Sequence, residues 1–207
     1  MSVVRLAHSD EGPRGGTAFL LLHGSPTDRH VWDPQVGDLV AAGFRVIRPD
    51  LRGHGASPPG EGPSTVEAMA EDVLALADQL KVPRFLLGGF SFGGWVAMKM
   101  VWEHPDRLEG LLLVSTGARA DSPRERAARP AQARELRRDG LQVDAYRDRV
   151  LTPETISKRP EVWDQAKRSM AAVSVEGRAR AIEGMATRPD FRAVLRGVKL
   201  PALVLGG

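Results

Sequence analysis

The feature that most constrains the fold is an alternation of short apolar runs with helical patterns. Apolar runs at residues 18–22, 44–47, 85–87 and 111–114 each end in turn residues, and a fifth run covers residues 202–205. Short runs that are apolar throughout are typical of parallel strands buried on both faces. Because helical patterns separate the first four runs, crossover connections must join them. The sequence therefore predicts an α/β fold with a doubly wound, mostly parallel sheet.

Three helical patterns lie between these runs. The first covers residues 33–42 and ends at a glycine, which is a common helix terminator. The second begins with Ser64 and Glu67, whose spacing matches a capping box. The third covers residues 93–103, because a residue that precedes a proline, here Pro105, is disfavoured in helical geometry. An apolar stripe marks the face of the second helix that we expect to be buried: Val66, Met69, Val73, Leu76 and Leu80.

The alternation stops after the fourth run. Residues 118–197 contain no convincing strand, and prolines break their helical patterns into short pieces. Helices inserted at this point of an α/β sheet would lie above the carboxyl ends of the strands, where ligands bind. The sequence therefore predicts a core over residues 1–117, a helical lid over residues 118–197 and a returning core strand over residues 198–207.

The predicted lid is rich in basic residues. Residues 118–200 hold 19 of the 29 Lys and Arg residues but only 12 of the 26 Asp and Glu residues. Such an excess can attract an anionic substrate or a nucleic acid. Here, however, both signs are interleaved, as in Arg124-Glu125-Arg126, without the aromatic platforms of a single-strand binder. We therefore expect solvated helix faces and no nucleic-acid partner.

The hydropathy of the chain argues against a membrane. No apolar run approaches the roughly 18 residues that a membrane-spanning helix needs, and residues 1–16 are too polar for a signal peptide. The absence of cysteine excludes disulfides, thiolate nucleophiles and zinc–thiolate sites. We expect a soluble, cytoplasmic protein without a membrane partner.

The pentapeptide Gly89-Phe90-Ser91-Phe92-Gly93 fits the pattern G-x-S-x-G. It directly follows the apolar run 85–87 and leads into the helix 93–103, which is the context of a strained strand-to-helix turn with a serine nucleophile. Glycines flank such a serine because a β-carbon there would collide with a neighbouring strand or helix. The alternative is a structural serine in a glycine-rich turn, and the strand–turn–helix context favours the nucleophile.

Other site chemistries are disfavoured. A phosphate-binding loop needs lysine after its last glycine, and Trp95 follows Gly94 in this chain. The same segment does not match the dinucleotide-binding pattern G-x-G-x-x-G. The five histidines are dispersed, without an H-x-x-x-H or H-E-x-x-H pair. We therefore expect no cofactor and no catalytic metal.

Three motifs in order carry a resemblance to a known family. They are His23-Gly24-Ser25-Pro26, the segment Asp50-Leu51-Arg52-Gly53-His54-Gly55-Ala56-Ser57, and the pentapeptide around Ser91. Together they resemble the α/β-hydrolase fold superfamily, in particular its branch of lid-bearing serine esterases, lactonases and haloperoxidase-like enzymes. The resemblance extends over essentially all 207 residues.

The resemblance implies roles for individual residues. Ser91 would be the nucleophile, and the backbone N–H groups of Ser25 and Phe92 would form the oxyanion hole. Because the elbow carries serine and not aspartate, acyl transfer to water is the expected chemistry, and the dehalogenase and epoxide-hydrolase branches are disfavoured. Four residues would support the motif turns: His23, Gly24, Gly89 and Gly93. Three aromatic residues would either wall an acyl pocket or belong to the ordinary core: Trp32, Phe90 and Trp95.

The chain departs from the family after Ser91. A serine hydroxyl needs a histidine to accept its proton and a carboxylate to orient that histidine, and the family's chain order is serine, acid, histidine. The only later histidine is His104, which a helix rising about 1.5 Å per residue holds roughly 20 Å from the serine. Asp121 is the nearest candidate for the acid.

We therefore expect the 207-residue chain to lack the triad histidine and acid, and to be a fragment without the final strand and helices of the fold. The apolar run 202–205 would then be an unprotected sheet edge.

Three functional hypotheses remain open from the sequence. The first is a serine hydrolase of small carboxylic esters or lactones that forms a Ser91 acyl-enzyme. The second is a non-catalytic binding protein with a hydrolase-like cleft. In the third, another chain supplies the missing strand and histidine. The sequence identifies neither the individual substrate nor the oligomeric state, and thioesterase, perhydrolase and C–C hydrolase chemistry use similar elbows.

Overall fold

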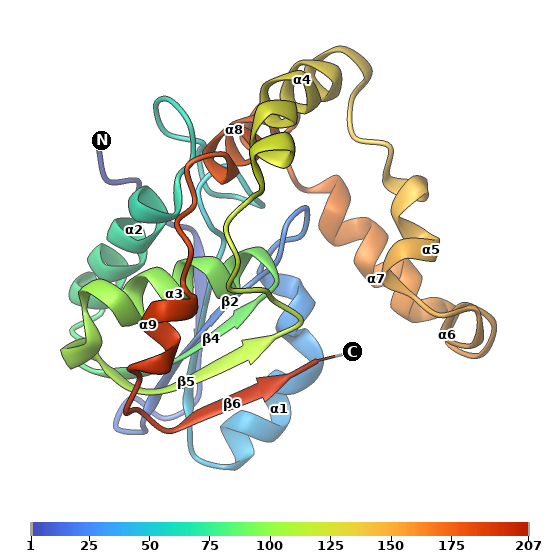
Figure 1. The fold of residues 1–207 in the computed structure, drawn as a ribbon. Coiled ribbons are helices and arrows are strands. Elements are labelled where there is room, and N and C mark those ends of the chain that lie inside the picture. Colours follow the sequence, from blue (N-terminus) through green and yellow to red (C-terminus); the bar gives the residue numbers. More distant parts are fainter. Residues whose placement is uncertain (1, 207) are drawn as a thin grey trace.

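A computed structural model describes residues 2–206, apart from the side chain of Arg149. Its centre is a six-stranded sheet of order β1-β3-β2-β4-β5-β6 (Figure 1). Only β1 runs antiparallel to its neighbour β3, and the other four pairings are parallel. The expected mostly parallel sheet is thus confirmed. The strands are β1 (His8–Glu11), β2 (Ala18–Leu22), β3 (Arg45–Pro49), β4 (Phe85–Phe90), β5 (Leu108–Val114) and β6 (Ala202–Leu205).

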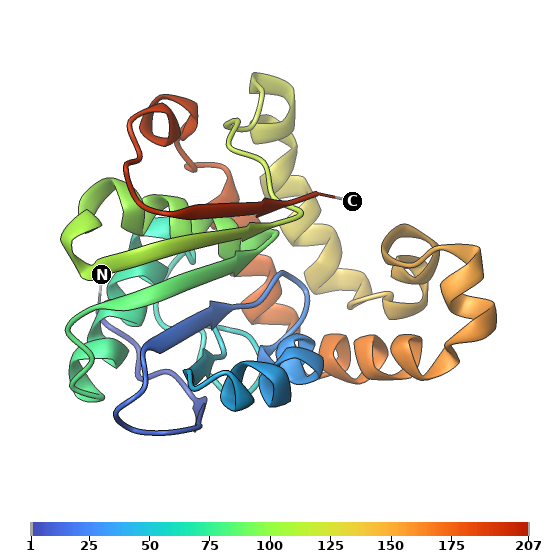
Figure 2. The same ribbon diagram turned by 90° about the horizontal axis from the view of Figure 1, so that it is seen from below.

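Helices cover both faces of the sheet, as Figures 1 and 2 show. Along β2, Leu20 and Leu22 pack into the main core on one face, whereas Leu21 packs on the other face. This alternation follows from the two-residue side-chain period of a strand. Helices α2 (Val66–Gln79) and α3 (Phe92–Glu103) cover the first face, and α1 (Asp33–Ala41) covers the second.

The start of α2 differs from the expected capping box. Thr65, and not Ser64, is the N-cap, and its hydroxyl accepts a hydrogen bond from the amide of Ala68 at 3.3 Å. Glu67 instead forms an ion pair with Lys99 of α3 at 3.3 Å. The predicted apolar stripe of α2 is nevertheless correct: Val66, Met69, Val73 and Leu76 are buried, and Leu80 packs against them. The helix therefore begins one residue later than its sequence pattern indicates.

A helical segment lies between β5 and β6 and covers the end of the sheet where the parallel strands finish (Figures 1 and 2). Helices α5, α6 and α7 stand out to one side of the core, while α4 and α8 pack against each other. The helices of the segment between β5 and β6 are α4 (Pro123–Asp139), α5 (Arg147–Val150), α6 (Pro153–Lys158), α7 (Pro160–Ala171), α8 (Val175–Met185) and α9 (Arg192–Arg196). Three short 3-10 helices complete the fold: η1 (Arg29–Trp32), η2 (Pro105–Arg107) and η3 (Val143–Tyr146). No helix within residues 2–206 is long and apolar enough to cross a membrane.

The chain leaves the core and returns to it at nearly the same point. The amide of Phe191 donates to the carbonyl oxygen of Ala118 at 2.8 Å, and the Phe191 ring is fully buried in the main core. Helix α9 follows directly and packs beside α3. The last residues of the segment predicted to be a lid, residues 191–197, therefore pack with the core.

Two glycines of α8 allow the helix to pack closely against the core loop that follows β3. A β-carbon on Gly177 would collide with the backbone of Gly53, and one on Gly184 would collide with the carbonyl of Ser64. The amide of Ser64 also donates to the carbonyl oxygen of Arg180 at 3.0 Å. One face of α8 is therefore in backbone-to-backbone contact with the core.

Replacing Gly184 with alanine is expected to lower the free energy of unfolding by about 1–3 kcal/mol, because α8 or the loop at Ser64 must move to admit the methyl group. The matched control is Gly37→Ala in α1, where a β-carbon meets nothing within 4 Å. That change is expected to be neutral or stabilising by up to about 1 kcal/mol, because alanine is the better helix former. Urea denaturation of both variants tests this, and equal stability of the two would contradict it.

Candidate active site

Ser91 lies at the junction of β4 and α3, in a backbone conformation that L-residues rarely adopt. Its φ and ψ angles are 48° and −109°. Two hydrogen bonds hold it there: its amide donates to the carbonyl oxygen of Val114 at 2.9 Å, and its carbonyl oxygen accepts from the hydroxyl of Thr116 at 2.8 Å. Such strain persists only where the surroundings enforce it, and it is common at functional sites.

Close backbone packing explains the glycines around Ser91. A β-carbon on Gly89 would lie 2.5 Å from the carbonyl oxygen of Gly93, and one on Gly93 would lie 2.6 Å from the carbonyl oxygens of Leu22 and His23. Gly94, which the pentapeptide pattern does not include, is equally constrained, because a β-carbon there would lie 2.6 Å from the side chain of Thr116. The turn therefore needs three glycines and not two.

The loop after β2 packs directly against this turn. A β-carbon on Gly24 would lie 2.8 Å from the ring of Phe90 and 3.3 Å from the β-carbon of Ser91. The structure thereby brings the predicted Ser25 loop next to the predicted nucleophile. Phe92 is the first residue of α3, where helix amides have no acceptor within their own helix. Both segments predicted to supply oxyanion amides thus flank Ser91.

Two buried histidines lie behind these loops, with both ring nitrogens of each engaged. Nδ1 of His23 donates to the carbonyl oxygen of Gly24 at 2.7 Å, while its Nε2 accepts from the amide of Leu51 at 2.9 Å. Nδ1 of His54 donates to the carbonyl oxygen of Arg52 at 3.0 Å, and its Nε2 is 2.8 Å from the hydroxyl of Ser25. Burial lowers the pKa of both imidazoles. These histidines are neutral members of the loop scaffold.

The other three histidines are bound elsewhere. His8 lies on the edge strand β1 and contacts the carbonyl oxygen of Leu6, while His30 pairs with Asp28. His104 follows the last residue of α3, 3.9 Å from a carboxylate oxygen of Glu71. In the part of the chain that the structure describes, no histidine forms a hydrogen bond with Ser91.

Asp121, the candidate acid, is buried between two arginines. Its oxygens accept from Nε of Arg129 at 2.7 Å and from Nη2 of Arg188 at 2.9 Å. The guanidinium of Arg188 in turn stacks on the ring of Trp95, 3.6 Å from its centroid. The ring nitrogen of Trp95 donates to the carbonyl oxygen of Gly117 at 3.0 Å. This cluster of Asp121, Arg129, Arg188 and Trp95 joins the helical segment between β5 and β6 to α3.

The Asp121 cluster gives the protein an acid-sensitive contact. Burial alone would raise the pKa of Asp121, but the hydrogen bonds from Arg129 and Arg188 outweigh it and hold the pKa below its ordinary value of 3.8. The resulting stabilisation is present above that value and is lost as the pH falls below it. We therefore expect Asp121→Asn to be less stable than the unmodified chain at neutral pH, with a difference that shrinks below about pH 4. Thermal denaturation of both proteins between pH 3 and 7 measures this, and a difference independent of pH would contradict it.

An apolar cavity of about 390 Å³ lies beside the elbow, between η1 and the helical segment that precedes β6. Phe90 is the only predicted pocket residue that lines it. Trp32 borders a neighbouring cavity of about 310 Å³ together with Phe90 and Leu205. Trp95 lines neither of these two cavities, because the Asp121 cluster holds it. The helical segment between β5 and β6 contributes apolar side chains to the larger cavity, which the sequence analysis did not identify: Val150, Leu151, Val162 and Met170.

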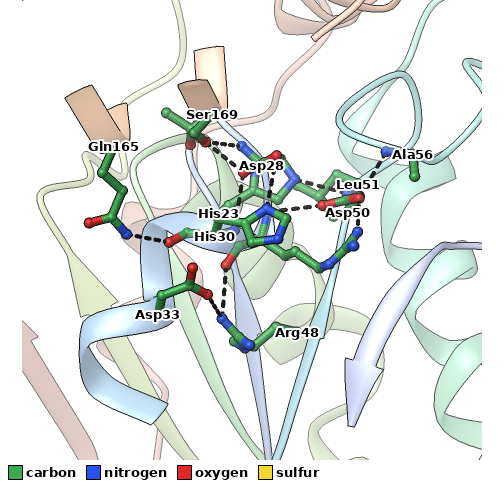
Figure 3. A network of polar contacts seen from close by, with 12 residues as sticks. His23, Asp28, His30, Asp33, Arg48, Asp50, Leu51, Ala56, Gln165 and Ser169 are labelled. Carbon is green, nitrogen blue, oxygen red and sulfur yellow. Dashed lines mark hydrogen bonds and ion pairs between the residues drawn. The ribbon is translucent and has the colours of Figure 1, made fainter. Parts of the chain in front are cut away.

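Polar contacts tie α7 to the loop before α1 at the edge of this cavity (Figure 3). The hydroxyl of Ser169 donates to Asp28 at 2.6 Å and accepts from the amide of Asp28 at 2.9 Å. The side-chain amide of Gln165 donates to the carbonyl oxygen of His30 at 3.0 Å. Behind them, Asp50 accepts from the amide of Ala56 at 2.9 Å, which closes the second motif into a compact turn. Residues 2–206 contain no cluster of three or more His, Asp or Glu side chains that could hold a metal ion.

Comparisons with known proteins agree with this architecture. The family model described as alpha/beta hydrolase fold matches residues 17–199. The chain is 30% identical over 206 residues to 3-oxoadipate enol-lactonase 2 of Acinetobacter baylyi, an alignment that covers 99% of this chain and 75% of the relative.

Two solved structures are similar over the same extent. A thermophilic esterase from Thermogutta terrifontis, determined with malate bound, has a TM-score of 0.93 and 39% identity, over 99% of this chain and 75% of that one. The enol-lactonase from Burkholderia xenovorans LB400 has a TM-score of 0.88 and 34% identity, over 99% and 78%. This chain thus spans about three-quarters of the length of each relative.

Proposed function

Because the chain belongs to the alpha/beta hydrolase fold family, we propose that it hydrolyses small carboxylic esters or lactones with Ser91 as the nucleophile. The observation that carries this proposal is the strained conformation of Ser91 between β4 and α3, with the Ser25 loop packed against it. The family makes the protein a hydrolase. The names of its relatives, an esterase and two enol-lactonases, support an ester or lactone substrate.

In the proposed reaction the hydroxyl oxygen of Ser91 attacks the carbonyl carbon of the substrate. The amides of Ser25 and Phe92 then donate hydrogen bonds to the carbonyl oxygen as it becomes an oxyanion, and one such donor is typically worth about 100- to 1000-fold in rate. The alcohol departs with a proton and leaves an acyl group on Ser91, which water removes in a second attack. The apolar cavity beside Phe90 would accommodate the acyl chain.

Both steps need a base that takes and returns the proton of Ser91. Within residues 2–206, each histidine is engaged elsewhere, and the carboxylate of Asp121 is occupied by two arginines. We therefore propose that residues 1–207 alone turn over esters poorly, and that the histidine and its carboxylate come from residues other than these.

The test compares the 207-residue chain with a version extended in frame through any downstream coding sequence. Each is mixed with p-nitrophenyl acetate, nitrophenol release is followed, and the protein is quenched for peptide mass spectrometry. We expect sustained turnover by the extended version and an acetyl group on the peptide that contains Ser91. Ser91-dependent turnover by the short chain at the same rate would overturn the proposal about the histidine, and acetylation at other residues only would overturn the role of Ser91.

The disposition of the histidines also favours a second candidate, a binding protein that retains the cleft without turnover. It predicts that both versions are folded, bind small esters and release no nitrophenol above the rate of buffer. Sustained turnover that depends on Ser91 in either version would exclude it.

A further inference from the structure

One arginine of the lid differs from the others in how its charge is balanced. Arg178 is half-buried on α8, and among the residues that the structure describes no carboxylate lies within ion-pair distance of it. Setting aside Arg149, every other arginine within residues 2–206 is either exposed or paired with Asp or Glu. The paired arginines that are not exposed are Arg29, Arg45, Arg48, Arg52, Arg107, Arg129, Arg180 and Arg188.

Part of the hydrogen-bonding capacity of Arg178 is also unused, although the side chain of Tyr146 lies within its reach. Its Nη1 donates to the hydroxyl of Ser25 at 2.6 Å, and its Nε is buried without a partner in the described part of the chain. Burial lowers the pKa of Arg178, Tyr146 opposes this shift, and the like charge of Arg129 adds to it. A guanidinium nevertheless stays charged in proteins. A shielded cation without an anion is costly, and it is compensated when a ligand supplies the opposite charge.

The direction of the hydrogen bonds links Arg178 to the substrate side of the elbow. Because arginine can only donate, the hydroxyl of Ser25 must use its own proton for Nε2 of His54. His54 can accept it, since its Nδ1 donates to the carbonyl oxygen of Arg52. The guanidinium of Arg178 thus contacts Ser25, the residue whose amide is proposed to stabilise the oxyanion. This contact with Ser25 is the observation that would bring a substrate held at that amide near Arg178.

We propose that Arg178 binds a free carboxylate of the substrate, so that this cleft selects esters or lactones that carry a second, ionised carboxyl group. A guanidinium can hold a carboxylate through two parallel hydrogen bonds, the geometry for which arginine is best suited. The substrate class rests on the proposed function, but binding of the carboxylate does not require turnover. The two proposals can therefore fail separately.

The test measures binding of uncleavable probes to the purified chain by isothermal titration calorimetry. The probes are the ω-amides of succinic, glutaric and adipic acid, each compared with the neutral alkyl amide of the same carbon number. We expect at least one acid amide to bind about 10- to 100-fold more tightly than its neutral counterpart, which is typical of a hydrogen-bonded charge pair. Arg178→Gln should abolish this difference, and Arg178→Lys should retain part of it.

Two controls separate binding from structure and from catalysis. Arg134→Gln removes an exposed arginine of α4 and should leave the difference unchanged. Ser91→Ala should also leave it unchanged, although it would abolish the proposed turnover. Equal binding of charged and neutral probes, or dissociation constants above about 10 mM for all acid amides, would overturn the proposal. So would a loss in Arg178→Gln that affects both probe types equally, because that result indicates that Arg178 only positions the Ser25 loop.

Discussion

Alanine in place of Ser91 is expected to lower kcat/KM for ester hydrolysis by at least about 1000-fold in whichever form of the protein turns over. Removal of the nucleophile leaves only the rate that the oxyanion amides and substrate binding provide. The fold should not change, because the amide and carbonyl of Ser91 make its hydrogen bonds to Val114 and Thr116, and these groups are retained. Initial rates with p-nitrophenyl acetate, together with urea denaturation, measure both quantities.

Glycine at the same position separates catalysis from strain. Relief of the conformation at φ 48° and ψ −109° should stabilise the protein by about 1–3 kcal/mol, and the greater freedom of glycine in the unfolded chain should offset about 0.5–1 kcal/mol of that. We therefore expect Ser91→Gly to be inactive but more stable than Ser91→Ala. If Ser91→Gly is less stable than Ser91→Ala, the backbone at the elbow is not strained. If Ser91→Ala keeps full activity, Ser91 is not the nucleophile.

Replacing Asp72 with alanine is expected to lower the free energy of unfolding by about 3–5 kcal/mol, a large part of the total stability of a domain. The guanidinium of Arg52, itself 1% exposed, donates to Asp72 from Nε at 2.5 Å and from Nη2 at 2.6 Å. Asp72 also accepts from the amide of Val4 at 2.7 Å. The substitution would leave the buried cation of Arg52 without a counter-charge and the buried amide of Val4 without its acceptor. Chemical denaturation monitored by circular dichroism gives the difference.

The matched control lies on the same helix. Asp78 of α2 pairs with Arg107 at 2.7 Å, but its side chain is 66% exposed, so Asp78→Ala should cost no more than about 1 kcal/mol. The double variant Arg52→Met with Asp72→Leu should recover much of the stability lost in Asp72→Ala, because it removes the unpaired charge. Similar losses for Asp72→Ala and Asp78→Ala would show that the Arg52 pair is not a buried charge pair in solution.

The central strands and the elbow could be predicted because their signals are local. The apolar runs before Ser91 and in β2 stand out from their neighbours, and glycines stand at fixed positions on both sides of Ser91. Strand β1 could not be found in this way. Its residues His8–Glu11 are all polar, and the strand depends on pairing with β3 and on the ion pair of Asp10 with Arg45.

Features that depend on tertiary contacts were missed or misplaced. Thr65 is the helix cap because the backbone of Ser64 packs against α8: its amide donates a hydrogen bond to α8, and its carbonyl lies close to Gly184. Nothing in the sequence distinguishes Asp121 from the acid of a catalytic triad. Its ion pairs with two arginines, which only the structure shows, indicate a different role. Arg178 is one of many lid arginines in the sequence, and its lack of a counter-charge emerges only when every other pairing is known.

The hydrogen bond between Phe191 and Ala118 has a consequence for how proteins of this design diversify. Because entry and exit of the insertion are adjacent, everything between them can be lengthened, exchanged or grafted from a relative without displacing a strand of the sheet. The turn at Ser91 and the insertion between residues 118 and 191 can then vary independently. A chimera joined at residues 118 and 191 would carry the acyl preference of the donor on the catalytic turn of the recipient.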